Sequence, residues 1–311
     1  MSKLKLNCFL LTASLLFAAN DDGPLSHRIA RSDALPSAGI RINVDLALVP
    51  VFVTDAYGRS VTGLARENFR VFEGSRQMPI QTFGRQDQPV AVGLIFDCSR
   101  SMRDKFPTAR EAARAFFEQL NPDDESFLIT ISDRAELRHS LTSDFRELQS
   151  ALLFARPTGS TSLLDGIYMG LQQIKKAHNP RKALIIVSDG GDNNSRYTER
   201  ELLSMAVESD TQIFAMGLHD NPQSQEEIEG PALLTDLCGR TGGVDFTIKN
   251  LSELHVAMGK VGVSLHNQYV LGYYPPDTTN TGKYRKIKVQ LMVPPNTPPL
   301  QVHARTGYYA R

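Results

Sequence analysis

Five residues have side-chain oxygen atoms that could bind a metal, and they lie near the apolar segments of the chain. Two are carboxylates and three are hydroxyls: Asp97, Ser99, Ser101, Thr161 and Asp189. Hard oxygen ligands are preferred by Mg²⁺, Mn²⁺ and Ca²⁺, whereas zinc prefers His or Cys. Because hydroxyls carry no charge, such a site leaves a divalent cation only partly neutralised. Water or a carboxylate from another molecule can then complete the shell, which favours a binding role.

Apolar segments and helical patterns alternate along the middle of the chain and would position these side chains. The nearly continuous apolar segments are 90–96, 127–131, 183–187 and 213–216, and the helical patterns cover 106–120, 163–174, 198–207 and 251–265. Continuous apolar runs are typical of strands buried on both faces of a parallel sheet. A short antiparallel edge strand is expected at 135–140. The alternation predicts an α/β fold with a doubly wound, mostly parallel sheet over residues 88–265.

The predicted sheet also explains how distant ligands could meet. In an open α/β sheet, ligands bind beyond the carboxyl ends of the strands, near the point where the strand order reverses. Asp97 and Asp189 each follow a predicted strand, and Thr161 precedes a predicted helix. We therefore expect all three to lie at one edge of the sheet.

The segments before and after this region have strand-like alternation and turn signals. Residues 40–87 form the first of these segments and residues 266–311 the second. Neither has many strands, and an isolated hairpin is marginally stable in water. We therefore predict that both segments pair into one small β-sandwich, with the α/β domain inserted between them.

The N-terminus has the pattern of an export signal. Two lysines precede an apolar stretch at 6–18, and small residues follow before the chain becomes polar. This stretch is short for a membrane span and suits a cleaved signal peptide over residues 1–19, with a flexible lead-in at 20–39. The alternative is a buried N-terminal helix. We expect an exported protein, periplasmic or secreted, with no transmembrane segment in the mature chain.

Composition narrows the possible functions. Lysine plus arginine and aspartate plus glutamate both number 34, and no basic run is present, so nucleic-acid binding is not expected. Cys8 would leave with the signal peptide. Cys98 and Cys238 are too few for a disulfide framework and are expected to be buried free thiols.

The five oxygen donors resemble the metal ion-dependent adhesion site (MIDAS) of the von Willebrand factor A (VWA) family. The family pattern is Asp-x-Ser-x-Ser, then Thr, then Asp, and it is matched by Asp97, Ser99, Ser101, Thr161 and Asp189. The resemblance implies a Rossmann-like fold and a bound cation, with Mg²⁺ expected and Mn²⁺ or Ca²⁺ as alternatives. It also implies that the serines and threonine touch the metal, that the aspartates often act through water, and that a protein partner supplies an Asp or Glu.

Three further residues are expected beside the metal, where a partner would bind: Arg100, Ser160 and Asp192. Arg100 departs from the family pattern, which often has glycine at this position. Its side chain could narrow access to the metal or contact an acidic partner, and the sequence does not distinguish these roles.

The flanking segments resemble those of secreted bacterial VWA-related proteins that are best represented in acidobacteria. The residues that carry this resemblance are Val53 to Asp55, Leu64, Phe69, Val71 to Gly74, Tyr269 to Tyr274 and Gly307 to Tyr309. The function of that group is poorly defined, so the resemblance informs the expected domain architecture more than the function.

Three functions are compatible with these residues. The first is a non-enzymatic, cation-dependent protein-binding module of the adhesion type. The second is a structural or assembly subunit of an envelope complex, in which metal only stabilises the fold. The third is a Mg²⁺-dependent phosphatase, because Asp97 is placed as in haloacid-dehalogenase-type enzymes. Those enzymes have a second Asp two residues later, where this chain has Ser99. We therefore expect no enzymatic activity.

Overall fold

The computed structural model describes residues 46–86, 88–189, 191–218, 225–276 and 282–310. Residues Val44–Arg311 form one compact unit. The predicted signal peptide and lead-in lie outside the described residues. Among the described residues, no helix has both the length and the apolar character that a membrane crossing requires.

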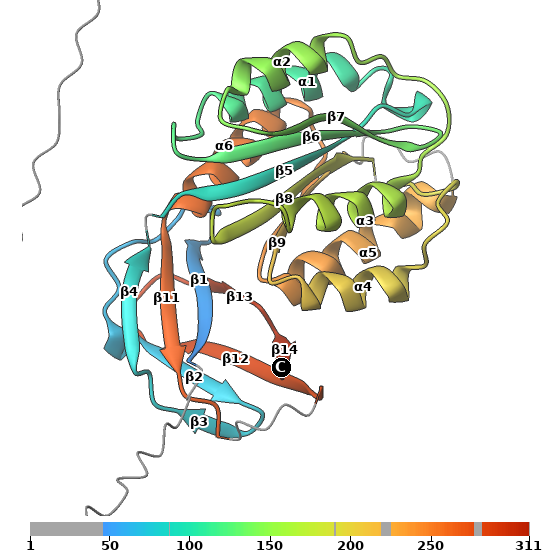
Figure 1. Cartoon of the computed structure of the whole chain (residues 1–311). Helices are drawn as coiled ribbons and strands as arrows, with labels where there is room; N and C mark the ends of the chain where they lie inside the picture. The colour runs from blue at the N-terminus through green and yellow to red at the C-terminus, as the bar shows by residue number, and fades with distance from the viewer. Residues whose placement is uncertain (1–45, 87, 190, 219–224, 277–281, 311) are drawn as a thin grey trace, which may run out of the picture. The chain divides into compact units, whose positions relative to one another are not determined.

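A six-stranded sheet forms the centre of the α/β region (Figure 1). Its strands, in spatial order, are β10 (Asp245–Ile248), β9 (Gln212–Leu218), β8 (Arg181–Ser188), β5 (Val90–Asp97), β6 (Glu125–Ile131) and β7 (Ala135–Thr142). All neighbours are parallel except β6 and β7, which are antiparallel. Every residue of β5 is buried, as its continuous apolar sequence predicts. The predicted fold class and edge strand are confirmed.

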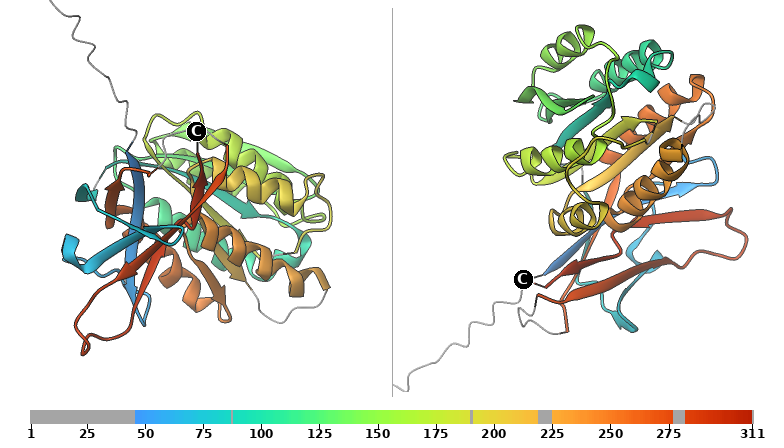
Figure 2. Two further views of the ribbon diagram at one scale, coloured as in Figure 1. Left: turned by 90° about the horizontal axis from the view of Figure 1, so that it is seen from below. Right: turned by 90° about the vertical axis from the view of Figure 1, so that its right-hand side faces the viewer.

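Helices cover both faces of this sheet (Figures 1 and 2). One face packs against α1 (Phe106–Phe117), α2 (Phe145–Leu153) and α6 (Ser252–His266), and the other against α3 (Leu163–Ile174), α4 (Glu199–Glu208) and α5 (Gln225–Thr241). Thr198 and Glu201 form a capping box at the start of α4. Helices α2 and α5 and strand β10 were not among the predicted elements. Helix α2 and strand β10 are short and only partly buried.

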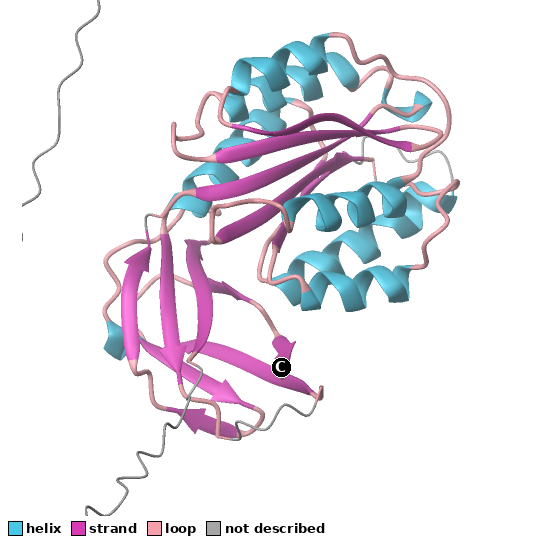
Figure 3. Cartoon of the chain, in the orientation of Figure 1, coloured by secondary structure: helices cyan, strands magenta, loops and turns pink. Residues whose placement is uncertain are grey.

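The flanking segments form two four-stranded sheets that share one core (Figure 3). One sheet has the order β13 (Leu300–Ala304), β1 (Ala47–Asp55), β11 (Gln268–Tyr273) and β4 (Thr82–Gln86), and the other has β14 (Gly307–Tyr309), β12 (Tyr284–Leu291), β2 (Phe69–Glu73) and β3 (Arg76–Met78). Strands from before and after the α/β region pair in both sheets. The chain crosses from one sheet to the other at Arg305 and Thr306, so the strand-like residues 300–309 form two strands and not one.

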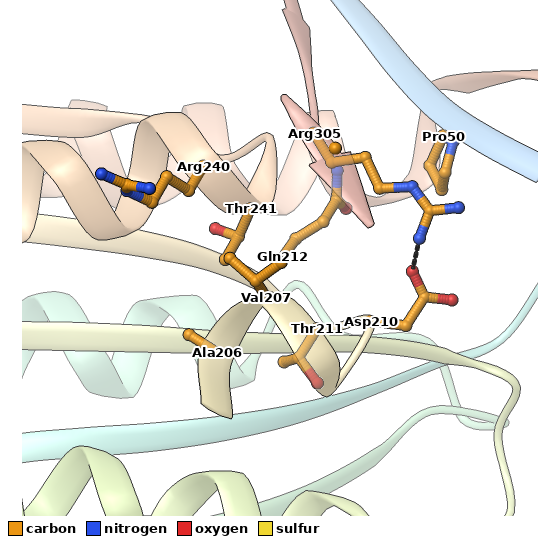
Figure 4. A pocket seen from close by; sticks show the side chains of 10 residues that line it. Pro50, Ala206, Val207, Asp210, Thr211, Gln212, Arg240, Thr241 and Arg305 are labelled. Atoms are coloured by element: carbon orange, nitrogen blue, oxygen red, sulfur yellow. Dashed lines mark hydrogen bonds and ion pairs between the residues drawn. The ribbon is translucent and has the colours of Figure 1, made fainter. Parts of the chain in front are cut away.

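This crossing also contacts the α/β region. Figure 4 shows Arg305 beside Asp210, with which it forms an ion pair. Arg305 also donates a hydrogen bond to the carbonyl oxygen of Leu48 at 2.7 Å. The backbone N–H of Thr306 donates to the carbonyl oxygen of Arg240, at the end of α5. These contacts attach the C-terminal strands to the α/β region.

His303 makes the stability of this region depend on pH. Its ring stacks on Phe52 at 4.5 Å, and its Nε2 lies 2.9 Å from Thr54 Oγ1. Burial lowers the pKa of His303 to about 4. The folded protein favours the neutral ring, so neutral His303 contributes to the free energy of unfolding. This contribution is fully present above the unfolded pKa of about 6.5 and is lost as pH falls toward 4.

We expect that protonation of His303 lowers the free energy of unfolding by up to about 3 kcal/mol between pH 7 and pH 4. Urea unfolding of the wild type and His303→Phe at both pH values measures it. The variant should lose less stability on acidification. An equal loss in both proteins would show that His303 is not responsible.

Candidate metal centre

Sheet topology brings Asp97 and Asp189 to the same edge. Strands β5 and β8 are parallel neighbours, with Phe96 paired to Val187, so both strands end at the same level. The strand order reverses here, because β6 lies on one side of β5 and β8 on the other. This is the switch point at which open α/β sheets bind ligands. The two carboxylates therefore lie where the sequence predicted.

The loop after β5 is held by its own polar side chains. Asp97 Oδ1 accepts a hydrogen bond from the backbone N–H of Ser99 at 2.8 Å, and Asp97 Oδ2 accepts from Ser188 Oγ at 2.6 Å. The Ser99 and Ser101 hydroxyls share a hydrogen bond at 3.0 Å. Asp97 thus fixes the loop on which both serine hydroxyls are presented together.

The loop that carries Thr161 is attached to the same place. The backbone N–H of Thr158 donates to the carbonyl oxygen of Cys98 at 2.7 Å, and that of Arg100 donates to Gly159 at 3.1 Å. Gly159 has φ of +75°, which favours glycine, and an added Cβ would lie 2.5 Å from a carboxylate oxygen of Asp133. These backbone contacts place Thr161, which is buried, at the carboxyl edge with the serines.

Two buried carboxylates interact at this site. Asp97 is fully buried and Asp189 is 2% exposed. Burial, together with repulsion from Asp189, raises the pKa of Asp97 well above its usual range, although hydrogen bonds from Ser188 and Ser99 oppose this. Asp189 Oδ1 is buried and accepts no hydrogen bond from any described residue. A buried carboxylate oxygen without a donor requires a cation or water.

Lys105 is a site residue that the sequence reasoning missed. Its Nζ lies 3.3 Å from Asp189 Oδ2, and its side chain is only 12% exposed. Lys105 is the N-cap of α1. A cation at this position opposes the helix dipole and supplies no capping oxygen. This unfavourable position of a lysine was a signal in the sequence, but it does not tell whether the side chain points to solvent or into a site.

The described residues fit a divalent cation bound through oxygen. No group of three or more His, Cys, Asp or Glu side chains in the described ranges is arranged to hold a metal. Burial raises the pKa of the Cys98 thiol to about 12, so its sulfur stays protonated and is a poor ligand. The hydroxyls of Ser99 and Ser101 and the free oxygen of Asp189 are the remaining donors, and they suit a hard cation.

The residues predicted beside the metal have different environments. Arg100 is exposed, Ser160 and Asp192 are half-buried, and Ser160 is tied through its backbone N–H to Asp133. Asp192 Oδ1 accepts hydrogen bonds from the Leu163 N–H and from a serine hydroxyl, so this oxygen holds the loop. Of these three residues, only Arg100 is exposed.

Comparisons with known proteins agree with this fold. Residues 92–191 match the family model of the von Willebrand factor type A domain. The comparison with curated proteins gave no match. The match to the family model covers part of the α/β region, so the predicted resemblance to the VWA family is confirmed for these residues.

Solved structures show the same fold at low sequence identity. A von Willebrand factor type A protein from Catenulispora acidiphila is 14% identical, with a TM-score of 0.52 over 78% of this chain and 65% of that one. Proximal thread matrix protein 1 from the mussel byssus, with a zinc-occupied MIDAS motif, is 16% identical, with a TM-score of 0.50 over 62% of this chain and 49% of that one. This chain therefore spans less than two thirds of either protein.

Proposed function

We propose that this protein is a cation-dependent protein-binding module of the adhesion type. Its metal would be held at the carboxyl edge of the six-stranded sheet by five residues: Asp97, Ser99, Ser101, Thr161 and Asp189. The observation that carries the proposal is the buried Asp189 oxygen without a donor among the described residues, at the same sheet edge as the paired serine hydroxyls. The bound cation would supply an electrophilic centre to which the Asp or Glu of a partner binds.

The residues of the site would have different roles in binding the metal and the partner. Asp97, whose two oxygens hold Ser99 and Ser188, keeps the loop in place and contributes charge from behind it. The serine hydroxyls contribute donors without neutralising the metal. Arg100, exposed at the same edge, offers a positive charge to an acidic partner, which favours this role over blocking access.

The probe for this function is acetate with the Mn²⁺-loaded protein. Mn²⁺ relaxes water protons, and a carboxylate that replaces a metal-bound water reduces this effect. We expect saturable Mn²⁺ binding and a saturable effect of acetate, both absent in Asp97→Asn. Lys182→Met, altered at the opposite end of β8, is the matched control and should behave as the wild type.

The structural alternative gives a different result in this experiment. If metal only stabilises an envelope subunit, Mn²⁺ should raise the melting temperature while acetate leaves the relaxation unchanged. That outcome would replace the binding proposal. The phosphatase alternative is tested by Mg²⁺-dependent hydrolysis of p-nitrophenyl phosphate, and activity that Asp97→Ala removes would overturn the proposal that the protein is not an enzyme.

The proposed ion is Mg²⁺, with Mn²⁺ or Ca²⁺ as alternatives. The byssus protein holds zinc in its MIDAS motif, so this kind of site also accepts zinc in that protein. Competition between Mg²⁺ and Zn²⁺ in calorimetry would rank them for this chain. We further propose export to the periplasm or the cell exterior, which the N-terminal signal pattern supports.

A further inference from the structure

Lys105 gives the candidate metal centre a positive charge of its own. The ion pair joins its Nζ to Asp189 Oδ2, while Asp189 Oδ1 remains without a donor among the described residues. Asp189 therefore has one oxygen assigned to a side-chain cation and one available to a metal. Both partners are largely buried, so water screens their charges weakly.

The charge balance of the site follows from these residues. Asp97 and Asp189 together contribute two negative charges when both are ionised, the hydroxyls contribute none, and Lys105 contributes one positive charge. Addition of a divalent cation changes the net charge of this set from −1 to +1 by this count. Without the lysine the same addition would end at zero. The lysine therefore leaves the loaded site with an excess positive charge that an incoming carboxylate can balance.

The position of Lys105 is fixed by the backbone. Its N–H donates to the carbonyl oxygen of Met102 at 2.9 Å, and its carbonyl oxygen accepts from Ala109 at 3.0 Å. Met102 is fully buried at the end of the short turn that carries Ser101. The lysine and the metal-ligating hydroxyl are thus parts of one turn, and the ammonium group is held close to Asp189.

We propose that Lys105 sets the ligand preference of this site by weakening cation binding and strengthening carboxylate binding. This rests on the proposed function. The lysine contacts the carboxylate that would also hold the metal, and like charges in a buried site repel strongly. The same charge attracts an anion that binds the metal. Lys105 is therefore a specificity residue for an acidic partner.

The test compares the wild type with Lys105→Met and Lys105→Arg. Methionine retains much of the apolar stem and removes the charge, whereas arginine retains the charge. Calorimetry measures Mn²⁺ affinity, and water-proton relaxation measures acetate binding to the Mn²⁺-loaded protein. We expect Lys105→Met to bind Mn²⁺ at least tenfold more tightly and acetate at least tenfold more weakly. Lys105→Arg should stay within about threefold of the wild type in both measurements, because the sign of the charge is unchanged.

The outcomes separate this inference from the proposed function. A wild type that binds no Mn²⁺ overturns the proposed function and the inference with it. A wild type that binds Mn²⁺ and acetate, with both affinities unchanged in Lys105→Met, overturns only the role of Lys105. Circular dichroism of Lys105→Met checks its fold, and if that variant unfolds, Lys105→Gln takes its place with the same expected directions.

Discussion

The double variant Ser99→Ala/Ser101→Ala is expected to lose at least about 100-fold in cation affinity while keeping its fold. Two hydroxyl ligands of a weakly charged site disappear, and the remaining donors leave a hard cation short of oxygen. The two hydroxyls bond to each other, so removing both leaves neither partner unpaired. We expect the free energy of unfolding to change by less than about 1 kcal/mol without metal.

Isothermal calorimetry with Mg²⁺ and urea unfolding in EDTA make these two measurements. Thr158→Ala is the matched control, because this exposed hydroxyl lies in the neighbouring loop and only its backbone N–H holds Cys98. The control should bind Mg²⁺ as the wild type does. Unchanged affinity in the double variant would exclude the serines as ligands.

Glu73→Ala is expected to lower the free energy of unfolding by about 3–5 kcal/mol, because it removes the acceptor of a buried polar cluster. Glu73 Oε2 accepts hydrogen bonds from the hydroxyls of Tyr273 at 2.8 Å and Tyr308 at 3.1 Å. Its Oε1 lies 3.4 Å from Arg285 Nη1, and both side chains are almost fully buried. Burial raises the pKa of Tyr273 and Tyr308, so both remain hydrogen-bond donors.

This cluster joins strand β2, which precedes the α/β region, to three strands that follow it. Urea unfolding should therefore show the two flanking segments losing stability together. Glu67→Ala, an exposed glutamate just before β2, is the control and should change the stability by less than about 0.5 kcal/mol. A loss below about 1 kcal/mol in Glu73→Ala would show that the cluster contributes little to the sandwich.

Continuous apolar strands and most of the helices were predictable from the sequence, whereas α5 and the short elements α2 and β10 were not. Strand β5 is buried on both faces, so its sequence is apolar throughout and does not alternate with polar residues. Helix α2 buries Leu148 and Leu152, but Leu153 at its end is 58% exposed and the next residue, Phe154, is 78% exposed. The apolar residues of this segment therefore do not all lie on one face. The crossing at Arg305 depends on contacts with residues far away in sequence, which a local pattern cannot reveal.

The candidate ligands were predictable because most of them come directly after two predicted parallel strands, and such strands end at the same edge of a sheet. Asp97, Ser99 and Ser101 are alternate residues of one short segment, and Asp189 directly follows the neighbouring strand. Lys105 was missed because its contact with Asp189 joins residues 84 positions apart. A charged side chain at a helix start can point to solvent or into a site, and only the fold distinguishes these.

The most direct test is a Mg²⁺ titration of the mature chain by calorimetry, with the wild type beside Asp97→Ala and a thermal melt of each. Asp97 holds the serine loop and supplies charge, so its loss should remove the site. We predict saturable binding in the wild type, none in the variant, and a folded state for both proteins in EDTA. Absence of binding in the wild type, or equal binding in the two proteins, would contradict the assignment of a metal centre to this edge of the sheet.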